Sequence, residues 1–314
     1  MAPSSPNNVV CVMDASTPLG IALVDRLLRL QFTVHAAIHS SISEFMFNGY
    51  DNKSLKIFHS DPFDYHSIID ALRGCCGLLY TFDPPRHQPT FDDDEMMVMG
   101  EMEVRAAHNV LEACAQTDTI DKVVFTSSVA AVIWGQDRNS TSVSHLDERF
   151  WSDVHFCRKF KYLNYNYAPE CIEQLWHGLS KTAAEKTAWA LARDRGVNMV
   201  SVNAGLLVGP DLTIDNPYLK GAAEMYESGL FVTVDLNYLV EAHIRVFQDL
   251  SSYGRYICFN HVINTNDDAA DLARKLTSLP PGEEQQFARE IPQRISNKKL
   301  NKLLMNFKGE EQIG

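Results

Sequence analysis

The feature that most constrains the fold is the alternation of apolar segments at the start of the chain. Residues 8–16, NVVCVMDAS, form a short β-branched run that ends in a polar turn, and residues 32–40, FTVHAAIHS, form a second such run. Between them lies a segment whose leucines recur at helical spacing: Leu19, Leu23, Leu27 and Leu30. A strand, a helix and a strand within about 35 residues predict a βαβ unit, which implies a right-handed crossover and a parallel strand pair.

The same alternation continues through the first two thirds of the sequence. Further strands are expected at 55–61, 77–82, 122–133 and 198–210, and further helices at 65–74, 99–116 and 181–196. Repeated βα units of this kind predict an α/β fold with a doubly wound parallel sheet. Ligands of such sheets bind at the carboxyl ends of the strands.

The pattern changes after Pro210 to short mixed elements. We therefore expect a sheet core over residues 1–210 and mainly a smaller substrate lobe over 211–314, with some of its segments returning to the sheet. Residues 279–290, LPPGEEQQFARE, are polar and rich in turn formers, which is typical of a mobile loop. The tail carries an apolar stripe at helical spacing, which predicts an amphipathic helix: Leu300, Leu303, Leu304 and Phe307.

Composition narrows the class of partner. The formal net charge of −12 argues against a nucleic acid or an anionic membrane as partner. No apolar run is long enough to span a bilayer, and the first residues show no signal peptide. The seven cysteines are odd in number and scattered without a C-x-x-C pair, which favours a reduced, cytoplasmic protein over a disulfide framework or a metal site.

Four ordered blocks of the sequence resemble one family. They are VVFTSSVAAV, LDERFWSDVHFCRK, HGLSKTAAEKTAWALARDRGVNMVSVNAGLLVGP and RISNKKLNKL. They are similar to plant cinnamoyl-CoA reductases and the related dihydroflavonol reductases, of the extended short-chain dehydrogenase/reductase superfamily. The resemblance implies a Rossmann core that binds a dinucleotide over residues 1–210. It also implies reduction of a hydroxycinnamoyl-CoA thioester, or a related small-molecule carbonyl, by NADPH in phenylpropanoid and lignin metabolism.

The phosphate-binding loop of that family reads G-x-x-G-x-x-G, and here Asp14, Thr17 and Gly20 stand at the glycine positions. Only the third glycine, which packs the helix on the strand, is kept. Thr17 adds a branched side chain where the pyrophosphate approaches, although its hydroxyl can donate to a phosphate. Asp14 adds a carboxylate, which weakens NADP(H) binding if it points inward. Thr17, Pro18 and Leu19 still form a helix N-terminus able to bind an anion, and a purely structural turn is the alternative.

Further cofactor positions carried over from the family also depart from its pattern. His39 stands where an Arg usually binds the 2′-phosphate of NADP, and a plain surface histidine is the equal alternative. Asp61 matches the aspartate that contacts adenine. The small loop after the fourth strand is replaced by Thr81 with the bulkier Phe82 and the charged Asp83.

The catalytic set of the superfamily is Ser, Tyr and Lys. Ser128 matches the serine that binds the substrate carbonyl, with Ser127 beside it as a substitute. Lys181 matches the lysine that holds the nicotinamide ribose. His177 stands at the tyrosine position, four residues before Lys181 and so on the same helix face.

Histidine has an ordinary pKa nearer neutrality than tyrosine, which suits a proton donor, but it is shorter and the Lys181 cation disfavours its charged form. A packed structural histidine is the alternative. The segment 162–174 resembles an insertion and supplies Tyr162, Tyr165 and Tyr167, yet no tyrosine in the chain lies four residues before a lysine.

Two functions remain compatible with the sequence. The first is an NADP(H)-dependent reductase with impaired or altered catalysis. The second is a pseudoenzyme, a Rossmann scaffold that binds a metabolite or a protein partner without turnover. The departures all fall on cofactor or proton-transfer positions, whereas the packing blocks look intact.

Overall fold

The computed structural model describes residues 8–39, 47, 49–51, 53–83, 93–135, 145–157, 170–219, 221–277 and 290–311. Seven parallel strands form the main sheet in the order β3-β2-β1-β4-β5-β6-β9. Their bounds are β1 (Val9–Met13), β2 (Thr33–Ile38), β3 (Leu55–His59), β4 (Gly77–Tyr80), β5 (Lys122–Ser128), β6 (Met199–Ala204) and β9 (Gly254–Cys258). The predicted doubly wound sheet is confirmed. The strand order reverses between β1 and β4, which is where such sheets bind their ligands.

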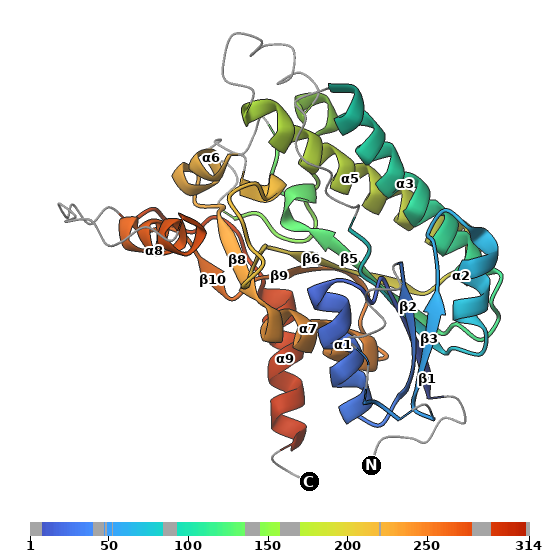
Figure 1. Cartoon of the computed structure of the whole chain (residues 1–314). Helices are drawn as coiled ribbons and strands as arrows, with labels where there is room; N and C mark the ends of the chain where they lie inside the picture. Colours follow the sequence, from blue (N-terminus) through green and yellow to red (C-terminus); the bar gives the residue numbers. More distant parts are fainter. Residues whose placement is uncertain are drawn as a thin grey trace.

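Helices cover both faces of this sheet (Figure 1). One face carries α1 (Pro18–Arg29), α7 (Leu236–Gln248) and α9 (Lys298–Glu311), and the other carries α2 (Tyr65–Leu72), α3 (Asp93–Ala115) and α5 (Glu170–Arg195). Leucines of α1 that recur at helical spacing in the sequence, Leu19, Leu23 and Leu27, are buried under the first face. The amphipathic tail helix packs Leu300 and Leu303 against the same core.

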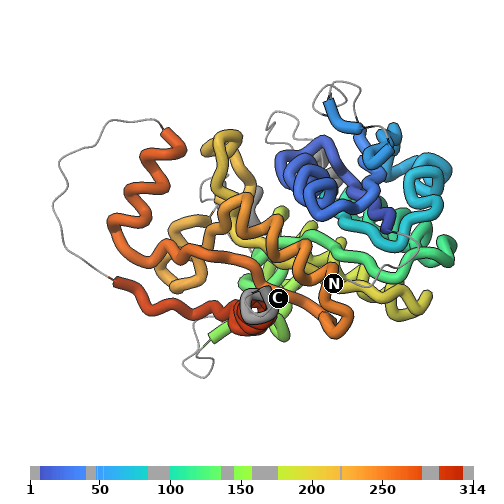
Figure 2. Tube along the Cα trace, turned by 90° about the horizontal axis from the view of Figure 1, so that it is seen from below, coloured from blue at the N-terminus to red at the C-terminus, as the bar shows by residue number. Residues whose placement is uncertain are grey.

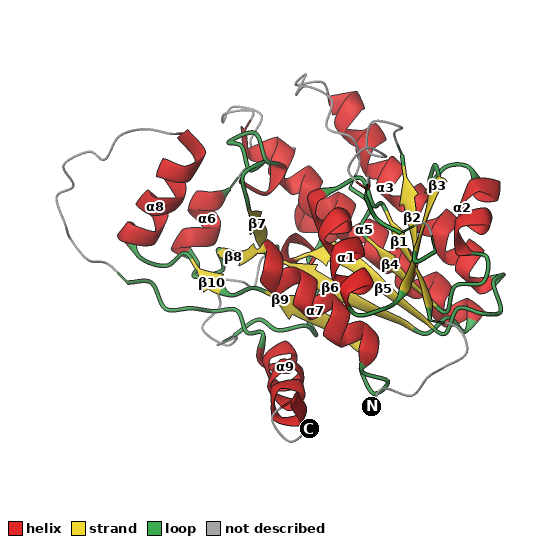
Figure 3. Cartoon of the chain, turned by 60° about the horizontal axis from the view of Figure 1, so that its bottom comes forward, coloured by secondary structure: helices red, strands yellow, loops and turns green. Residues whose placement is uncertain are grey.

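A smaller lobe lies beside the main sheet (Figures 2 and 3). It contains α6 (Ala222–Glu227), α8 (Asn266–Thr277) and a three-stranded sheet in the order β10-β8-β7, with β7 (Leu206–Val208), β8 (Val232–Asp235) and β10 (His261–Val262). The apolar run 198–210 therefore forms two strands in two sheets. Gly205 lies at the break, where a Cβ would come within 2.8 Å of the Val232 carbonyl oxygen.

The start of α5 differs from the expectation drawn from the sequence, and two suspected loop segments lie largely outside the described residues. Helix α5 begins at Glu170, well before the residue 181 expected for its start, so residues 170–174 of the suspected insertion belong to the helix. The remainder of that insertion, and nearly all of the suspected loop 279–290, lie outside the described residues. None of the described helices combines the length and the hydropathy that a membrane crossing requires.

Candidate functional site

The turn between β1 and α1 is closed by its own side chains. Thr17 is the N-cap of α1, and its hydroxyl oxygen accepts a hydrogen bond from the Gly20 N–H at 3.0 Å. The Asp14 carboxylate turns back onto the same loop and accepts from the Ser16 N–H at 2.7 Å. Pro18, the first residue of the helix, has no N–H to offer. Groups that an anion would normally bind at a helix N-terminus are therefore partly used inside the protein.

Some capacity for an anion remains at this turn. The backbone N–H groups of Thr17 and Leu19 have no acceptor among the residues that the structure describes. Gly20 permits the close approach of helix and strand, since a Cβ there would lie 2.1 Å from the Asp14 carbonyl oxygen. The packing role expected of Gly20 thus has a direct geometric basis.

The other expected cofactor positions surround this turn. His39 directly follows β2, its side chain is exposed, and its backbone N–H donates to the Ser16 hydroxyl at 3.0 Å. Asp61 lies just beyond β3, half-buried, and one of its carboxylate oxygens accepts from the Phe63 N–H at 2.8 Å. Thr81 is buried after β4 and donates its hydroxyl to the Asp14 carbonyl at 2.7 Å. Thr81 thereby ties the ends of β4 and β1 together.

Ser127 and Ser128 end strand β5 but have different surroundings. The Ser128 oxygen accepts from the Ala130 N–H at 3.1 Å and so caps the short helical turn η2 (Val129–Ala131). Ser127 donates to the fully buried Glu185 carboxylate at 2.8 Å. Because the Ser127 hydroxyl already donates its hydrogen bond to Glu185, Ser128 is the better candidate to bind a substrate oxygen.

Glu185 belongs to a buried polar network below the ends of β5 and β6. Its carboxylate pairs with Arg255 at 2.8 Å and accepts from Ser201 and Asn203, each at 2.7 Å. Asn203 in turn donates to the Ser128 carbonyl at 3.2 Å. This network fixes the backbone that carries Ser128.

His177 and Lys181 both project from α5, as the i, i+4 spacing requires. The glycine after His177, Gly178, lets α5 lie against η2 and the residues that follow it. A Cβ at this position would lie 3.4 Å from the Ala130 carbonyl oxygen and 2.7 Å from Trp134 Cδ1. The His177 ring is half-buried, and its centroid lies 6.4 Å from that of Tyr218. Because η2 directly follows Ser128, this contact places the part of α5 that carries His177 beside the end of β5.

Tyr218 is the tyrosine whose ring contact with His177 the structure records, and its hydroxyl has a partner of its own. Tyr218 is buried beside His177, but its hydroxyl donates to the Val232 carbonyl at 3.3 Å. Burial raises the pKa of Tyr218 above its ordinary value, which makes it a weaker acid. The three tyrosines of the suspected insertion, Tyr162, Tyr165 and Tyr167, lie outside the described residues.

Lys181 is held by two carboxylates. Its ammonium lies 3.0 Å from Asp83 Oδ1 and 2.8 Å from Glu103 Oε1. Burial by itself would lower the pKa of Lys181, but the two carboxylates outweigh it, so the pKa lies above its ordinary value. Lys181 is therefore a fixed cation at neutral pH.

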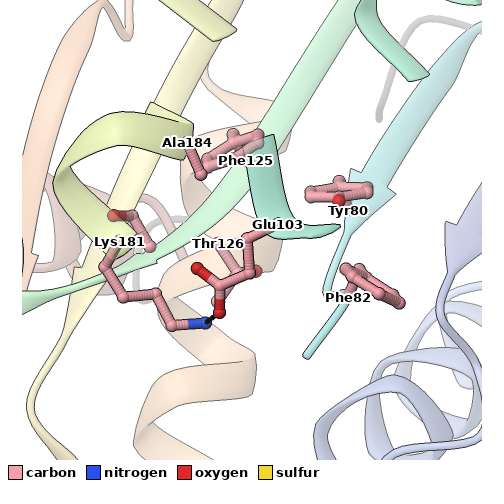
Figure 4. Close-up of a pocket in the computed structure, with 8 residues that line it drawn as sticks. Tyr80, Phe82, Glu103, Phe125, Thr126, Lys181 and Ala184 are labelled. Carbon is pink, nitrogen blue, oxygen red and sulfur yellow. Dashed lines mark ion pairs between the residues drawn. The ribbon is translucent and has the colours of Figure 1, made fainter. Parts of the chain in front are cut away.

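A small pocket opens beside this lysine (Figure 4). Its lining combines the Lys181–Glu103 pair with three aromatic rings and the end of β5: Tyr80, Phe82, Glu103, Phe125, Thr126, Ser127, Lys181 and Ala184. Phe82 is buried in this lining, so its ring forms part of the pocket wall.

Glu103 is the site residue that the sequence reasoning missed. It lies on α3, and with Ala106, Ala107 and Val110 it forms an i, i+3, i+4, i+7 stripe whose members are all buried. A glutamate on the apolar face of a helix is a signal of a buried charge that needs a partner. The sequence shows that anomaly, but it does not name Lys181 as the partner.

Comparison with known proteins now assigns the family. Cinnamoyl-CoA reductase 1 of Petunia hybrida is 30% identical to the chain over 316 residues, covering 95% of the chain and 87% of the relative. The chain belongs to the family of cinnamoyl-CoA reductases and dihydroflavonol reductases. The resemblance drawn from the sequence blocks is thereby confirmed. Dihydroflavonol 4-reductase of Zea mays is 28% identical, covering 98% of the chain and 86% of that protein.

Solved structures agree on the fold. The yeast methylglyoxal/isovaleraldehyde reductase Gre2, solved as a complex with NADPH, superposes with a TM-score of 0.71 at 20% identity, covering 94% of the chain and 92% of Gre2. No family model matches the chain. Among the described residues, no group of three or more His, Cys, Asp or Glu side chains could hold a metal ion.

Proposed function

We propose that the protein is an NADP(H)-dependent reductase that acts on a hydroxycinnamoyl-CoA or a related small-molecule carbonyl, with a weakened hold on the cofactor. The observation that carries this proposal is the placement of Lys181 and Ser128 on neighbouring elements at the carboxyl edge of a doubly wound sheet, in a chain of a reductase family. A role in phenylpropanoid or lignin metabolism follows from the relatives' names alone and is part of the proposal. The cytoplasm is the proposed location, because the described cysteines are all free.

The residues fit a dinucleotide, with fewer donors to its phosphates than a glycine-rich loop provides. Gly20 supplies the close packing, and the N–H groups of Thr17 and Leu19 face no described acceptor. Asp61 and His39 would hold the adenosine end, and Lys181 the nicotinamide ribose. Asp14 opposes binding because its carboxylate lies on the loop that would receive the pyrophosphate.

When bound, reduced NADP supplies the hydride for the carbonyl carbon. The part of the protein in the reaction is then to polarise the carbonyl oxygen and to deliver a proton to it. In the proposed mechanism the Ser128 hydroxyl donates a hydrogen bond to that oxygen. His177, directly or through a water, supplies the proton, and Lys181 remains an ammonium that holds the ribose. A ketone or aldehyde is thereby reduced to the alcohol. With a CoA thioester, the hemithioacetal that forms then loses its C–S bond as the carbonyl re-forms, and CoA leaves as the thiol carrying that proton.

A specific pair of observations favours the second function, a pseudoenzyme that binds a metabolite or a protein partner. Lys181 is bound by two carboxylates, and the loop after β1 is capped by Thr17 and Asp14. In both places, side chains of the protein itself bind groups that would otherwise be available to a cofactor.

Titration with cofactor separates the two functions. The reductase is expected to bind NADPH and NADP⁺, and to bind NADH more weakly if His39 contacts the 2′-phosphate. Calorimetry that detects no binding of either NADP form at millimolar concentration would overturn the reductase assignment. If cofactor binds, the donor role is tested by comparing His177→Tyr with the native chain on a hydroxycinnamoyl-CoA. A higher kcat for the variant supports His177 as the donor position, whereas an unchanged or lost activity contradicts it.

A further inference from the structure

Glu103 places a negative charge at the pocket that the family pattern did not lead us to expect. Its Oε1 lies 2.8 Å from the Lys181 ammonium, and both side chains line the pocket (Figure 4). The exposed fractions of the two side chains are only 7% for Glu103 and 15% for Lys181. Charges so far from solvent are weakly screened, so they act strongly on other charges in the pocket.

Neighbouring groups fix the Glu103 carboxylate in this position. The Ser180 hydroxyl donates to its second oxygen, Oε2, at 2.6 Å, while Oε1 accepts from Lys181. The Glu103 side chain lies on the buried face of α3, and this helix packs along α5. With both oxygens bound, the carboxylate cannot turn towards solvent without breaking these contacts.

The two forms of the cofactor differ in charge at only one place. NADP⁺ and NADPH share the adenosine, the phosphates and both riboses, but the nicotinamide ring is positive in the oxidised form and neutral in the reduced form. A nearby negative charge therefore stabilises the oxidised form selectively, whereas the lysine alone would favour the reduced form. The loop after β1 contacts groups that both forms share, so its departures cancel in the ratio of the two affinities.

We propose that Glu103 is a specificity-determining residue that shifts the preference of the site towards the oxidised cofactor. This inference rests on the proposed function, in which Lys181 holds the nicotinamide ribose. Tighter binding of NADP⁺ relative to NADPH makes the bound reduced form a stronger reductant, by linkage between binding and reduction. Glu103 thereby favours carbonyl reduction over alcohol oxidation at this site.

The test is the ratio of the two dissociation constants, Kd(NADPH)/Kd(NADP⁺), measured by calorimetry for the native chain and three variants. Glu103→Gln removes the charge while keeping the shape, and it is expected to lower the ratio by about threefold to tenfold. This is the effect of one unit charge about 12 Å from the nicotinamide ring at an effective dielectric of roughly 20 to 40. Glu103→Asp keeps the charge and is expected to retain most of the native ratio. Glu101→Gln is the matched control, because Glu101 lies on the same helix but is exposed, and its ratio is expected to stay native.

The possible outcomes distinguish a failure of the Glu103 proposal from a failure of the proposed reductase function. If Glu103→Gln changes both dissociation constants by the same factor, the role of Glu103 is positional and the inference is overturned, while the reductase assignment stands. The same holds if Glu103→Asp shifts the ratio as much as Glu103→Gln does. If neither cofactor form binds any of the four proteins at millimolar concentration, the proposed function fails and the inference fails with it. Circular dichroism of each variant establishes that it is folded.

Discussion

Glu103 on α3 and Lys181 on α5 form a 2.8 Å ion pair that joins two helices at the pocket. Because Glu103 also accepts from Ser180, and Lys181 also pairs with Asp83, each partner has a further contact. The pair therefore has a structural role in addition to any role in binding, and the two can be measured separately.

Removal of Lys181 is expected to leave two carboxylates without their cation. We expect Lys181→Met to lower the free energy of unfolding by about 1 to 3 kcal/mol, because an unpaired buried charge is costly and Asp83 is partly screened by solvent. The double variant Lys181→Met with Glu103→Gln is expected to recover about half of that loss. Urea denaturation of the single and double variants measures this coupling. Strict additivity of the two changes would contradict an energetic pairing of the residues.

The loop after β1 is expected to gain cofactor affinity when its glycines are restored. Asp14→Gly removes a carboxylate, and Thr17→Gly frees the Gly20 N–H that the threonine hydroxyl now binds. The double variant is expected to bind NADPH about 10- to 100-fold more tightly in calorimetry, while losing less than about 1 kcal/mol of stability, since glycine is an acceptable N-cap.

Adenosine 2′-phosphate provides the control for that prediction, because it lacks the pyrophosphate. Its affinity is expected to be the same in the native chain and in the double variant. An equal gain for both ligands would show that the loop does not act through the pyrophosphate.

His243 is expected to make the protein less stable in acid. It is fully buried on α7, where its Nδ1–H donates to the Leu239 carbonyl and its Nε2 accepts from the Thr126 hydroxyl, both at 2.8 Å. Burial lowers the pKa of His243 to about 4. Between that pKa and the unfolded value near 6.5, the unfolded chain binds a proton that the folded chain does not. Stability therefore rises with pH across this window and is independent of this group above it.

The contribution of His243 is isolated by substitution. From about pH 6 to 4, the native chain is expected to lose up to about 1.4 kcal/mol per pH unit through this residue alone. His243→Gln lacks the titrating ring, so its unfolding free energy from urea melts is expected to fall less steeply over the same range. Parallel pH profiles of the two proteins would contradict the assignment.

The Glu185–Arg255 pair is expected to be the most sensitive polar contact in the core. The exposed fractions are 0% for the Glu185 side chain and 7% for that of Arg255, and the pair anchors the end of β5. Arg255→Met leaves Glu185 buried without its cation and is expected to cost about 3 to 5 kcal/mol in the free energy of unfolding. Arg29→Gln breaks an exposed helix pair with Asp25 and is expected to cost less than about 1 kcal/mol. Comparable losses in the two variants would show that burial does not govern these pairs.

The sheet and the family could both be predicted from the sequence. Period-2 and period-3.6 apolar patterns are local, and the order in which they alternate leaves a parallel, doubly wound sheet as the consistent arrangement. The substitutions at Asp14, Thr17 and His177 were also visible, because a motif is read position by position.

The contacts that those substituted residues make could be seen only in the folded chain. The Thr17 hydroxyl accepts from the Gly20 N–H because the backbone turns there into the first turn of α1. The Ser127 hydroxyl donates to Glu185, which lies 58 residues further along the chain. The pairing of Lys181 with Glu103 spans two helices, and with Asp83 it extends to the end of a strand. Ion pairs between distant segments depend on where the folded chain places each charge, and no periodicity within one segment encodes that distance.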